Sequence, residues 1–468
     1  MDLQKENKMG TMPVGRLLIS MSLPMIVSML VQALYNVVDS YFVGMVSLEA
    51  LTAVGQAFSA QNLMIGIATG TGVGVNALLS KALGEKDPVR ANRIAENGVL
   101  LALVGYVVIL VFGLFGCNLY FDGILSSAQL DAGLDLAAVK ESGIAYLRIC
   151  TILSLFVFLE IMFERLMQST GKTIYTMYTQ GVGAIFNIVF DPIFILDELP
   201  FGLRGLGLGA AGAAWATVLG QAVACVLAIL LNHRFNTEIC LKVREFRPDF
   251  AIIKNIYAIG VPSIIMVAVG SVMYYAMNII LMGVSAFGAS IFGVYFKLQS
   301  FVFMPLFGMN NGVIPIIAYN YGAGNRRRMM KTVKLAACVA LGFMLLGLLL
   351  MQLIPDVLLS LFIKEAAVVE LGCTALRIIS TSFLFAGVCI VLGSVFQALG
   401  RGSYSMLVSI ARQLLVLVPV AYLLARSGDL NLIWWSYPIA EVVSLTVTLL
   451  LFARIYRQII AKIPEGAE

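Results

Sequence analysis

The chain contains twelve long apolar runs, and these constrain its fold more than any other feature. Each run holds about 20 residues or more, the length that an α-helix needs to cross the hydrocarbon core of a bilayer. Because the runs are continuous and do not alternate with a period of two, they predict helices and not barrel strands. We therefore predict an all-α polytopic membrane protein. The runs lie near residues 17–43, 50–79, 97–119, 143–167, 173–196, 209–232, 251–283, 286–320, 333–354, 370–398, 404–425 and 431–453.

Composition excludes several classes of protein. Of the 468 residues, 60% are hydrophobic and 12% are charged, whereas soluble domains are about half apolar and a quarter charged. This composition leaves too little polar surface for a soluble enzyme or a nucleic-acid-binding protein. The single histidine, His233, argues against a multi-histidine metal site. The sequence Gly171-Lys172-Thr173 lacks the first glycine of a P-loop, so we expect neither an ATP site nor a resident cofactor.

Basic residues are distributed unevenly between the loops. The N-terminus, the even-numbered loops and the C-terminus hold 22 of the 31 Lys and Arg residues, and the odd-numbered loops hold four. Cytoplasmic loops carry an excess of basic residues. We therefore expect a multi-pass protein of the cell (inner) membrane with both termini in the cytoplasm.

The two halves of the sequence repeat each other. One constant offset aligns Pro24 with Pro262, and a slightly shorter offset further along aligns Leu147-Arg148-Ile149 with Leu376-Arg377-Ile378. Each repeat has six spans, so both enter the membrane from the same side, and a pseudo-two-fold axis along the membrane normal is expected to relate them. This architecture favours a secondary transporter with its site near the membrane midplane. The predicted parts are an N-terminal lobe at 1–232, a cytoplasmic linker at 233–250 and a C-terminal lobe at 251–468.

Polar and acidic side chains at membrane depth are the sharpest functional signal. A carboxylate there costs at least about 2.5–3.5 kcal/mol, so its presence indicates a function. The fifth span places Asn187 and Asp191 one turn apart on one face. The second span carries three polar residues, each seven positions after the last (Asn62, Thr69 and Asn76). In the first span, one helix face carries Gln32, Tyr35, Asn36 and Asp39.

These residues predict a cation-coupling site made of Asp39, Asp191, Asn187 and Asn36. A desolvated carboxyl among neutral amides can gain and lose a proton as access to it alternates. Alternatively, Asp39, Asn187 and Asp191 provide the oxygen ligands that Na⁺ prefers. The residues leave the choice between H⁺ and Na⁺ open, and also a structural role for both acids near helix ends. The repeat-related positions, Met277, Val416 and Val420, carry no acid, so the site is expected in the first lobe.

An ordered set of motifs resembles the multidrug and toxic compound extrusion (MATE) family over essentially the whole chain. The motifs include SLPMIVSMLVQALYNVVDSYFVG (22–44), ALTAVG (50–55), QSTGK (168–172), NIVFDPIFI (187–195) and GLGLGAAGAAWAT (205–217). The resemblance implies a secondary active multidrug efflux antiporter, not an enzyme, that exports organic, often cationic compounds in exchange for H⁺ or Na⁺ by alternating access. The acids of the first lobe resemble the DinF-like branch, because the acids that NorM-like members carry in spans 7 and 10 are missing here.

Polyspecific binding of organic cations or amphiphilic drugs favours aromatic and flexible side chains. Besides the bilayer we expect such small molecules as partners, no nucleic acid, and a monomer. Pro24 can bend the first span and is a candidate hinge. Glu160 and the adjacent Glu164 and Arg165 are weaker candidates, interpreted mainly as structural. We expect the substrate cleft to be lined by Gln32, Tyr35, Tyr274, Tyr275, Asn278, Lys297 and Gln299.

Two other functions stay open. A flippase for lipid-linked oligosaccharides would need several cationic residues in the central cavity to hold pyrophosphate, and only Lys297 is an obvious candidate. An intramembrane aspartyl protease using Asp39 and Asp191 would need a GxGD-type motif, which the chain lacks.

Overall fold

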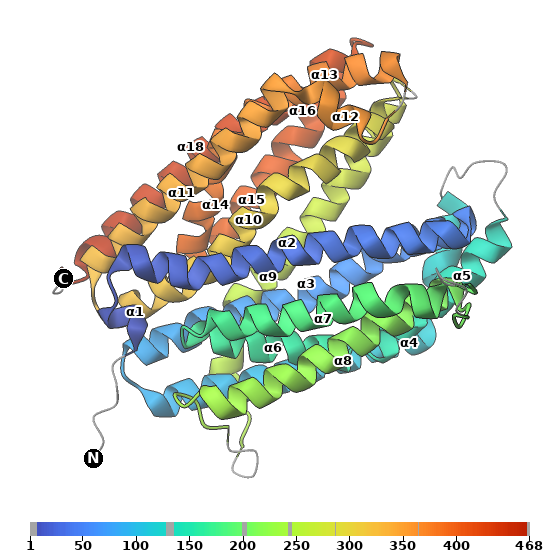
Figure 1. Ribbon diagram of the computed structural model, residues 1–468. Coiled ribbons are helices and arrows are strands. Elements are labelled where there is room, and N and C mark those ends of the chain that lie inside the picture. The colour runs from blue at the N-terminus through green and yellow to red at the C-terminus, as the bar shows by residue number, and fades with distance from the viewer. Residues whose placement is uncertain are drawn as a thin grey trace. The chain divides into compact units, whose positions relative to one another are not determined.

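The computed structural model describes residues 7–127, 135–198, 204–241, 246–285, 287–363 and 365–465. Within these ranges almost the whole chain is helical (Figure 1). Ten helices are long and apolar enough to cross a membrane, and two bent helix pairs each supply one more span. The described residues therefore supply the twelve spans that the sequence predicts.

The first six spans are built from α1 (Lys8–Thr11), α2 (Val14–Val46), α3 (Leu48–Gly84), α4 (Pro88–Ser127), α5 (Leu136–Ile152), α6 (Leu155–Ser169), α7 (Thr173–Ile195) and α8 (Gly209–Phe235). The other six are built from α9 (Phe250–Met282), α10 (Gly288–Gly322), α11 (Arg326–Leu353), α12 (Pro355–Ser360), α13 (Ala366–Ser380), α14 (Phe383–Ala398), α15 (Gly402–Ile410), a π-helical segment (Ala411–Leu417), α16 (Val418–Ala425), α17 (Leu430–Ile433), α18 (Ser436–Gln458) and a final 3₁₀ turn (Ile460–Lys462).

The helices repeat in the register that the sequence predicts. α4 and α11 begin at the repeat-related residues Pro88 and Arg326, and α7 and α15 begin at the repeat-related residues Thr173 and Gly402. In both repeats the fourth span is broken, since α5 and α6 meet at 47° and α13 and α14 also meet at 47°. At the second break the side-chain hydroxyl groups of two adjacent residues, Thr381 and Ser382, donate to carbonyls three residues earlier. Such bonds compete with the helical ladder and favour a bend.

The chain divides into two compact units. The N-terminal unit comprises Val27–Leu79 and Pro88–Tyr257, and the C-terminal unit comprises Met1–Ile26, Ser80–Asp87 and Ala258–Glu468. α6 packs against α4, α7 and α8 in the first unit, and α14 packs against α10, α11 and α18 in the second (Figure 1). Each unit is thus a helix bundle with its own core.

This division differs from the lobe boundaries expected from the sequence. The start of α2 belongs to the C-terminal unit, where the Ser22 hydroxyl donates to the Met309 carbonyl oxygen over 3.3 Å. Within the linker expected at 233–250, residues 242–245 lie outside the described part. The described part of that linker contacts α4 through a hydrogen bond, which the Asp249 N–H donates to Asn97 Oδ1 over 3.0 Å. The lobe boundaries stay a prediction.

Two repeat-related glycines allow a close helix approach in the C-terminal unit. A Cβ atom on Gly84 would lie 2.0 Å from the Tyr319 carbonyl oxygen, and one on Gly322 would lie 2.2 Å from the Lys81 carbonyl oxygen. Lys81 and Tyr319 are themselves repeat-related, at the same offset as Gly84 and Gly322. The ends of α3 and α10 therefore pack backbone against backbone in two equivalent contacts, as only glycine permits.

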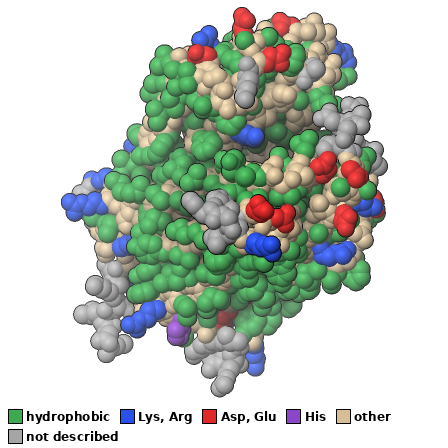
Figure 2. Space-filling model, turned by 45° about the vertical axis from the view of Figure 1, so that its right-hand side comes forward, with side chains coloured by type: hydrophobic (Ala, Val, Ile, Leu, Met, Phe, Trp, Pro, Cys, Tyr) green, Lys and Arg blue, Asp and Glu red, His purple; other side chains and the backbone are tan. Residues whose placement is uncertain are grey.

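The surface of the molecule is largely apolar. Figure 2 shows a face covered mainly by hydrophobic side chains, with few charged ones among them. On α4, a row of large apolar side chains (Val107, Val111, Leu114 and Phe115) is exposed. Apolar surface of this extent indicates contact with lipid.

Candidate functional site

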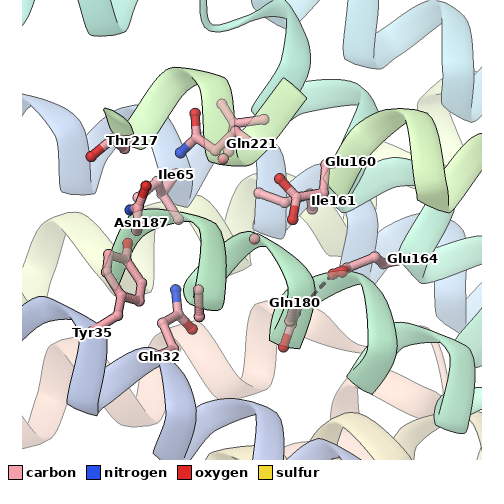
Figure 3. A pocket seen from close by; sticks show the side chains of 14 residues that line it. Gln32, Tyr35, Ile65, Glu160, Ile161, Glu164, Gln180, Asn187, Thr217 and Gln221 are labelled. Atoms are coloured by element: carbon pink, nitrogen blue, oxygen red, sulfur yellow. Dashed lines mark hydrogen bonds between the residues drawn. The ribbon is translucent and has the colours of Figure 1, made fainter. Parts of the chain in front are cut away.

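A pocket lies inside the N-terminal unit. It encloses about 660 Å³ of space, including some open to solvent. Five helices, α2, α3, α6, α7 and α8, supply its walls (Figure 3). The lining residues are Gln32, Tyr35, Ile65, Val157, Glu160, Ile161, Glu164, Gln180, Gly183, Ala184, Asn187, Thr217, Gly220 and Gln221.

One stripe of α6 forms the acidic wall of the pocket. Val157, Glu160, Ile161 and Glu164 follow the spacing i, i+3, i+4, i+7, so all four face the pocket. The two glutamates lie one turn apart, a spacing at which like charges destabilise a helix. None of the lining residues is Lys or Arg. The chain therefore maintains two carboxyl groups in an apolar bundle without a cation among the residues that line the same space.

The two glutamates differ in their partners. Glu164 accepts hydrogen bonds from Thr179 Oγ1 over 2.6 Å and from Gln180 Nε2 over 2.8 Å (Figure 3 shows the latter). The Glu160 carboxylate, in contrast, has no hydrogen-bond donor among the described residues. Arg165, next to Glu164 in the sequence, donates to Gln168 Oε1 over 2.9 Å and does not line the pocket. Glu164 thus belongs to the pocket and is not only part of an edge pair with Arg165.

Asn187 is held in the pocket wall by a close approach of α7 and α8. Its side chain is 4% exposed, and its Oδ1 atom has no hydrogen-bond donor within the described residues. A Cβ atom on Gly220 would lie only 2.8 Å from this Oδ1 and 3.0 Å from the Gly183 carbonyl oxygen. The absence of a side chain at Gly220 therefore leaves room for the amide.

Asp39 and Asp191 are both buried, at 9% and 0% exposure. Asp39 Oδ1 and both carboxylate oxygens of Asp191 have no hydrogen-bond partner in the described part of the chain. Neither residue lines the pocket, but Asp191 lies one turn beyond Asn187 on α7. The two carboxyls interact electrostatically with each other and with Tyr35, which does line the pocket. The structure thus brings Asp39, Asn187 and Asp191 together beside the pocket, whereas the Asn36 side chain is exposed.

The residues expected to line a substrate cleft fall into two groups. Gln32 and Tyr35 line the pocket (Figure 3). The other five belong to the C-terminal unit and do not line it. There, the Tyr274 ring stacks on Phe292 at 5.1 Å, and Asn278 Nδ2 donates to the Tyr274 carbonyl over 3.0 Å.

The remaining candidates of that group are more open. Tyr275 is 63% exposed, and Lys297 Nζ lies 5.8 Å from the centre of the Phe362 ring. Gln299 is half-buried. Pro24 lies inside α2, just before the helix passes from the C-terminal to the N-terminal unit after Ile26. The cleft and hinge roles stay predictions.

The sequence analysis missed part of the pocket. α8 contributes Thr217, Gly220 and Gln221, whose i, i+3, i+4 spacing in an apolar helix was the available signal. The polar stripe of the second span lies elsewhere, because α3 gives only Ile65 to the pocket. Asn76 of that stripe instead accepts a hydrogen bond from Ser169 Oγ over 2.9 Å.

The described part of the site offers no donor set for a transition metal. Among the described residues, no three His, Cys, Asp or Glu side chains come together. The available ligands are carboxylate, amide and hydroxyl oxygens, which suit a proton or a hard cation.

Known proteins resemble this chain over nearly its whole length. It is 26% identical over 423 residues to the multidrug export protein MepA of Staphylococcus haemolyticus, covering 90% of this chain and 89% of that protein. It is 25% identical over 435 residues to MepA of Staphylococcus aureus, covering 92% of this chain and 91% of that protein. A solved structure of a MATE family multidrug resistance transporter in an outward-facing conformation superposes with a TM-score of 0.89 at 24% identity, covering 99% of this chain and 100% of that one.

The fold is therefore that of the MATE transporters, with twelve helices in two repeats, as the sequence predicts. A family model, MatE, matches residues 24–193 and 262–423. The two matched segments begin at the repeat-related residues Pro24 and Pro262. The family consists of transporters and not of enzymes. The chain belongs to the MatE family of membrane transporters.

Proposed function

We propose that the chain is a multidrug efflux antiporter that exports organic, often cationic or amphiphilic compounds in exchange for H⁺ or Na⁺ by alternating access. One observation carries the proposal: Asp39, Asn187 and Asp191 lie buried beside one pocket with four side-chain oxygens that lack a hydrogen-bond donor among the described residues. Buried acceptors without donors are costly in a native structure. A coupling cation that binds and leaves would satisfy them for part of each transport cycle.

The chemistry of these groups fits either ion. A proton on a carboxyl turns an unpaired acceptor into a donor for its neighbour, so one proton satisfies two oxygens. Na⁺ would take oxygen ligands from Asp39, Asn187 and Asp191, and the Thr217 hydroxyl on the same pocket could add one more. One positive charge that moves inward across 100 mV supplies about 2.3 kcal/mol. That energy sustains a roughly fifty-fold gradient of a neutral solute. Exchange of one monovalent organic cation for one ion moves no net charge and is driven by the concentration gradient of the ion alone.

The substrate class follows from the relatives and the pocket. MepA is by its name a multidrug export protein, and it resembles this chain along its length. The pocket joins two glutamates to Tyr35 and to apolar residues such as Ile65, a combination that favours lipophilic cations. A lipid-linked oligosaccharide flippase is less consistent with these features, because the described residues that line the pocket include no Lys or Arg to hold a pyrophosphate.

We infer the setting of the protein from the loops. The excess of basic residues in the even-numbered loops supports a cell-membrane protein with cytoplasmic termini. The acids of the N-terminal unit and their absence at the repeat-related positions support a DinF-like type. We also propose that one chain transports alone and without ATP, because the candidate site lies within a single unit of a single chain.

The test is transport by proteoliposomes that contain the purified full chain. Efflux of a fluorescent organic cation is followed under an imposed pH gradient and then under a sodium gradient. Wild type is compared with Asp39→Asn, Asp191→Asn and, as a matched control, Asp356→Asn, which removes an exposed acid from α12.

The proposal expects that one of the two gradients drives efflux, and that the effective gradient identifies the ion. Asp39→Asn and Asp191→Asn should abolish gradient-driven efflux, whereas Asp356→Asn should transport like wild type. Full efflux by Asp39→Asn would remove that residue from coupling. The absence of efflux under both gradients would contradict antiport.

A further inference from the structure

We propose that Glu160 is a specificity-determining residue of the pocket: its carboxylate binds the protonated amine of an organic cation, and the pocket therefore prefers cations with N–H groups to cations of equal size without them. The inference rests on the proposed export of organic cations and adds a selection rule to it. It concerns the α6 wall, which is separate from the coupling residues Asp39 and Asp191.

The first argument is the unequal satisfaction of the two glutamates. Thr179 and Gln180 donate to the two oxygens of Glu164. Glu160, four residues earlier on the same stripe, has no donor among the described residues and lines the open space of the pocket. Figure 3 shows its carboxylate directed into that space, away from the Glu164–Gln180 pair. Glu164 is thus held in place by the protein, whereas Glu160 is available to a ligand.

The second argument is the kind of polar atom that the pocket leaves unpaired. The buried Oδ1 of Asn187 and Oε1 of Gln180 both lack a donor in the described chain, and both residues line the pocket. Asn187 is only 4% exposed, so bulk water does not satisfy its amide oxygen. Each of these atoms is an acceptor. A ligand that suits them must bring hydrogen-bond donors, and next to a carboxylate the fitting donor is a protonated amine.

The third argument is the form of the remaining wall. Ile65, Val157, Ile161 and Ala184 give the pocket an apolar lining, and Tyr35 adds an aromatic ring. A quaternary or fully alkylated cation would still profit from the apolar wall and from the ring, but it would leave the acceptor atoms unpaired. Selection by N–H groups follows from this difference.

Two xanthene dyes of equal charge and almost equal shape test the proposal. Rhodamine 123 carries amino groups with N–H donors, whereas in tetramethylrhodamine methyl ester methyl groups replace those hydrogens. Binding of each dye to the full chain in detergent micelles, with no ion gradient, is measured by fluorescence anisotropy. The variants are Glu160→Gln, Glu160→Asp and the control Glu141→Gln, which removes an exposed acid from α5.

We expect wild type and Glu141→Gln to bind rhodamine 123 about tenfold more tightly than the methylated dye, as one charge-assisted hydrogen bond provides. Glu160→Gln should lose most of this preference, because only the neutral acceptors of Asn187 and Gln180 remain, and Glu160→Asp should retain more of it. Equal affinities of wild type for the two dyes would overturn the proposal, and so would an unchanged preference in Glu160→Gln. If thermal unfolding shows that Glu160→Gln does not fold, the ratio of the two dye affinities is measured for Glu160→Asp instead, and an unchanged ratio overturns the proposal.

This measurement is independent of coupling. Loss of efflux in Asp39→Asn together with an unchanged dye preference in Glu160→Gln would refute the inference and leave the antiporter standing. Loss of the preference in Glu160→Gln together with full efflux in Asp39→Asn would support the inference and refute the coupling site.

Discussion

Substitution of Gly220 by alanine separates packing from ion binding at the candidate site. The new Cβ would lie 2.8 Å from Asn187 Oδ1 and 3.0 Å from the Gly183 carbonyl oxygen. Relief of both contacts requires a shift of about 0.7 Å, since non-bonded atoms prefer separations of about 3.5 Å. Overpacking of this kind costs about 1–3 kcal/mol, and alanine returns about 1 kcal/mol of helix propensity. The net loss of stability should therefore be about 0–2 kcal/mol.

The same contact should also weaken binding of the coupling ion. The contact pushes directly on the amide oxygen proposed to bind the coupling ion, and a loss of about 1.4 kcal/mol there weakens ion affinity about tenfold. Gradient-driven efflux from proteoliposomes, measured against the concentration of the coupling ion, should shift by that factor, with thermal unfolding in detergent measured alongside. Gly181→Ala is the control, because a Cβ on Gly181 meets nothing within 4 Å. An ion dependence of Gly220→Ala identical to that of Gly181→Ala would refute this reasoning.

Three further predictions concern stability. Gly84→Ala and Gly322→Ala should each lower the free energy of unfolding by at least about 1–3 kcal/mol, because each new Cβ would lie 2.0 or 2.2 Å from a backbone carbonyl oxygen. Chemical denaturation measures this loss, and an unchanged stability of either variant would contradict the close approach of the two helices. The Glu441 carboxylate lies 2.8 Å from the Arg412 guanidinium, so Glu441→Gln should lower the free energy of unfolding by about 1–3 kcal/mol. In a double-mutant cycle, the added substitution Arg412→Met should restore part of this loss. Burial lowers the pKa of Lys172, which lies between α6 and α7. Just below pH about 10.4 the unfolded chain therefore binds more protons than the folded chain. Stability should therefore rise with pH in that window, and Lys172→Met should flatten the rise in thermal unfolding.

The sequence predicts the fold well because the bilayer reduces the problem to length and hydropathy. Runs of apolar residues predict the twelve spans, and the repeat predicts their register, down to the matching starts of α4 at Pro88 and α11 at Arg326. The division into two units was not predicted in the same way. It depends on which helix the Ser22 end of α2 packs against, and that partner, Met309, is 287 residues away.

The candidate site was predicted in part, for a related reason. Asp39 and Asp191 are identified by the cost of a charge at membrane depth, and periodicity adds Asn187. Periodicity states which residues share a face of one helix, but not which faces meet. It therefore grouped Asn36 with Asp39, although Asn36 is exposed and Asp39 is buried.

What the structure adds is the distribution of hydrogen-bond donors around acidic groups. Sequence marks Glu160 and Glu164 equally, as two glutamates one turn apart in an apolar span. In the fold, α7 presents Thr179 and Gln180 to Glu164 alone. Because an unpaired buried acceptor is costly, the carboxyl without donors is the one whose satisfaction must come from outside the chain. The same reasoning singles out Asn187 and Asp191, the residues that we propose for coupling, whose side-chain oxygens also lack donors in the described part of the chain.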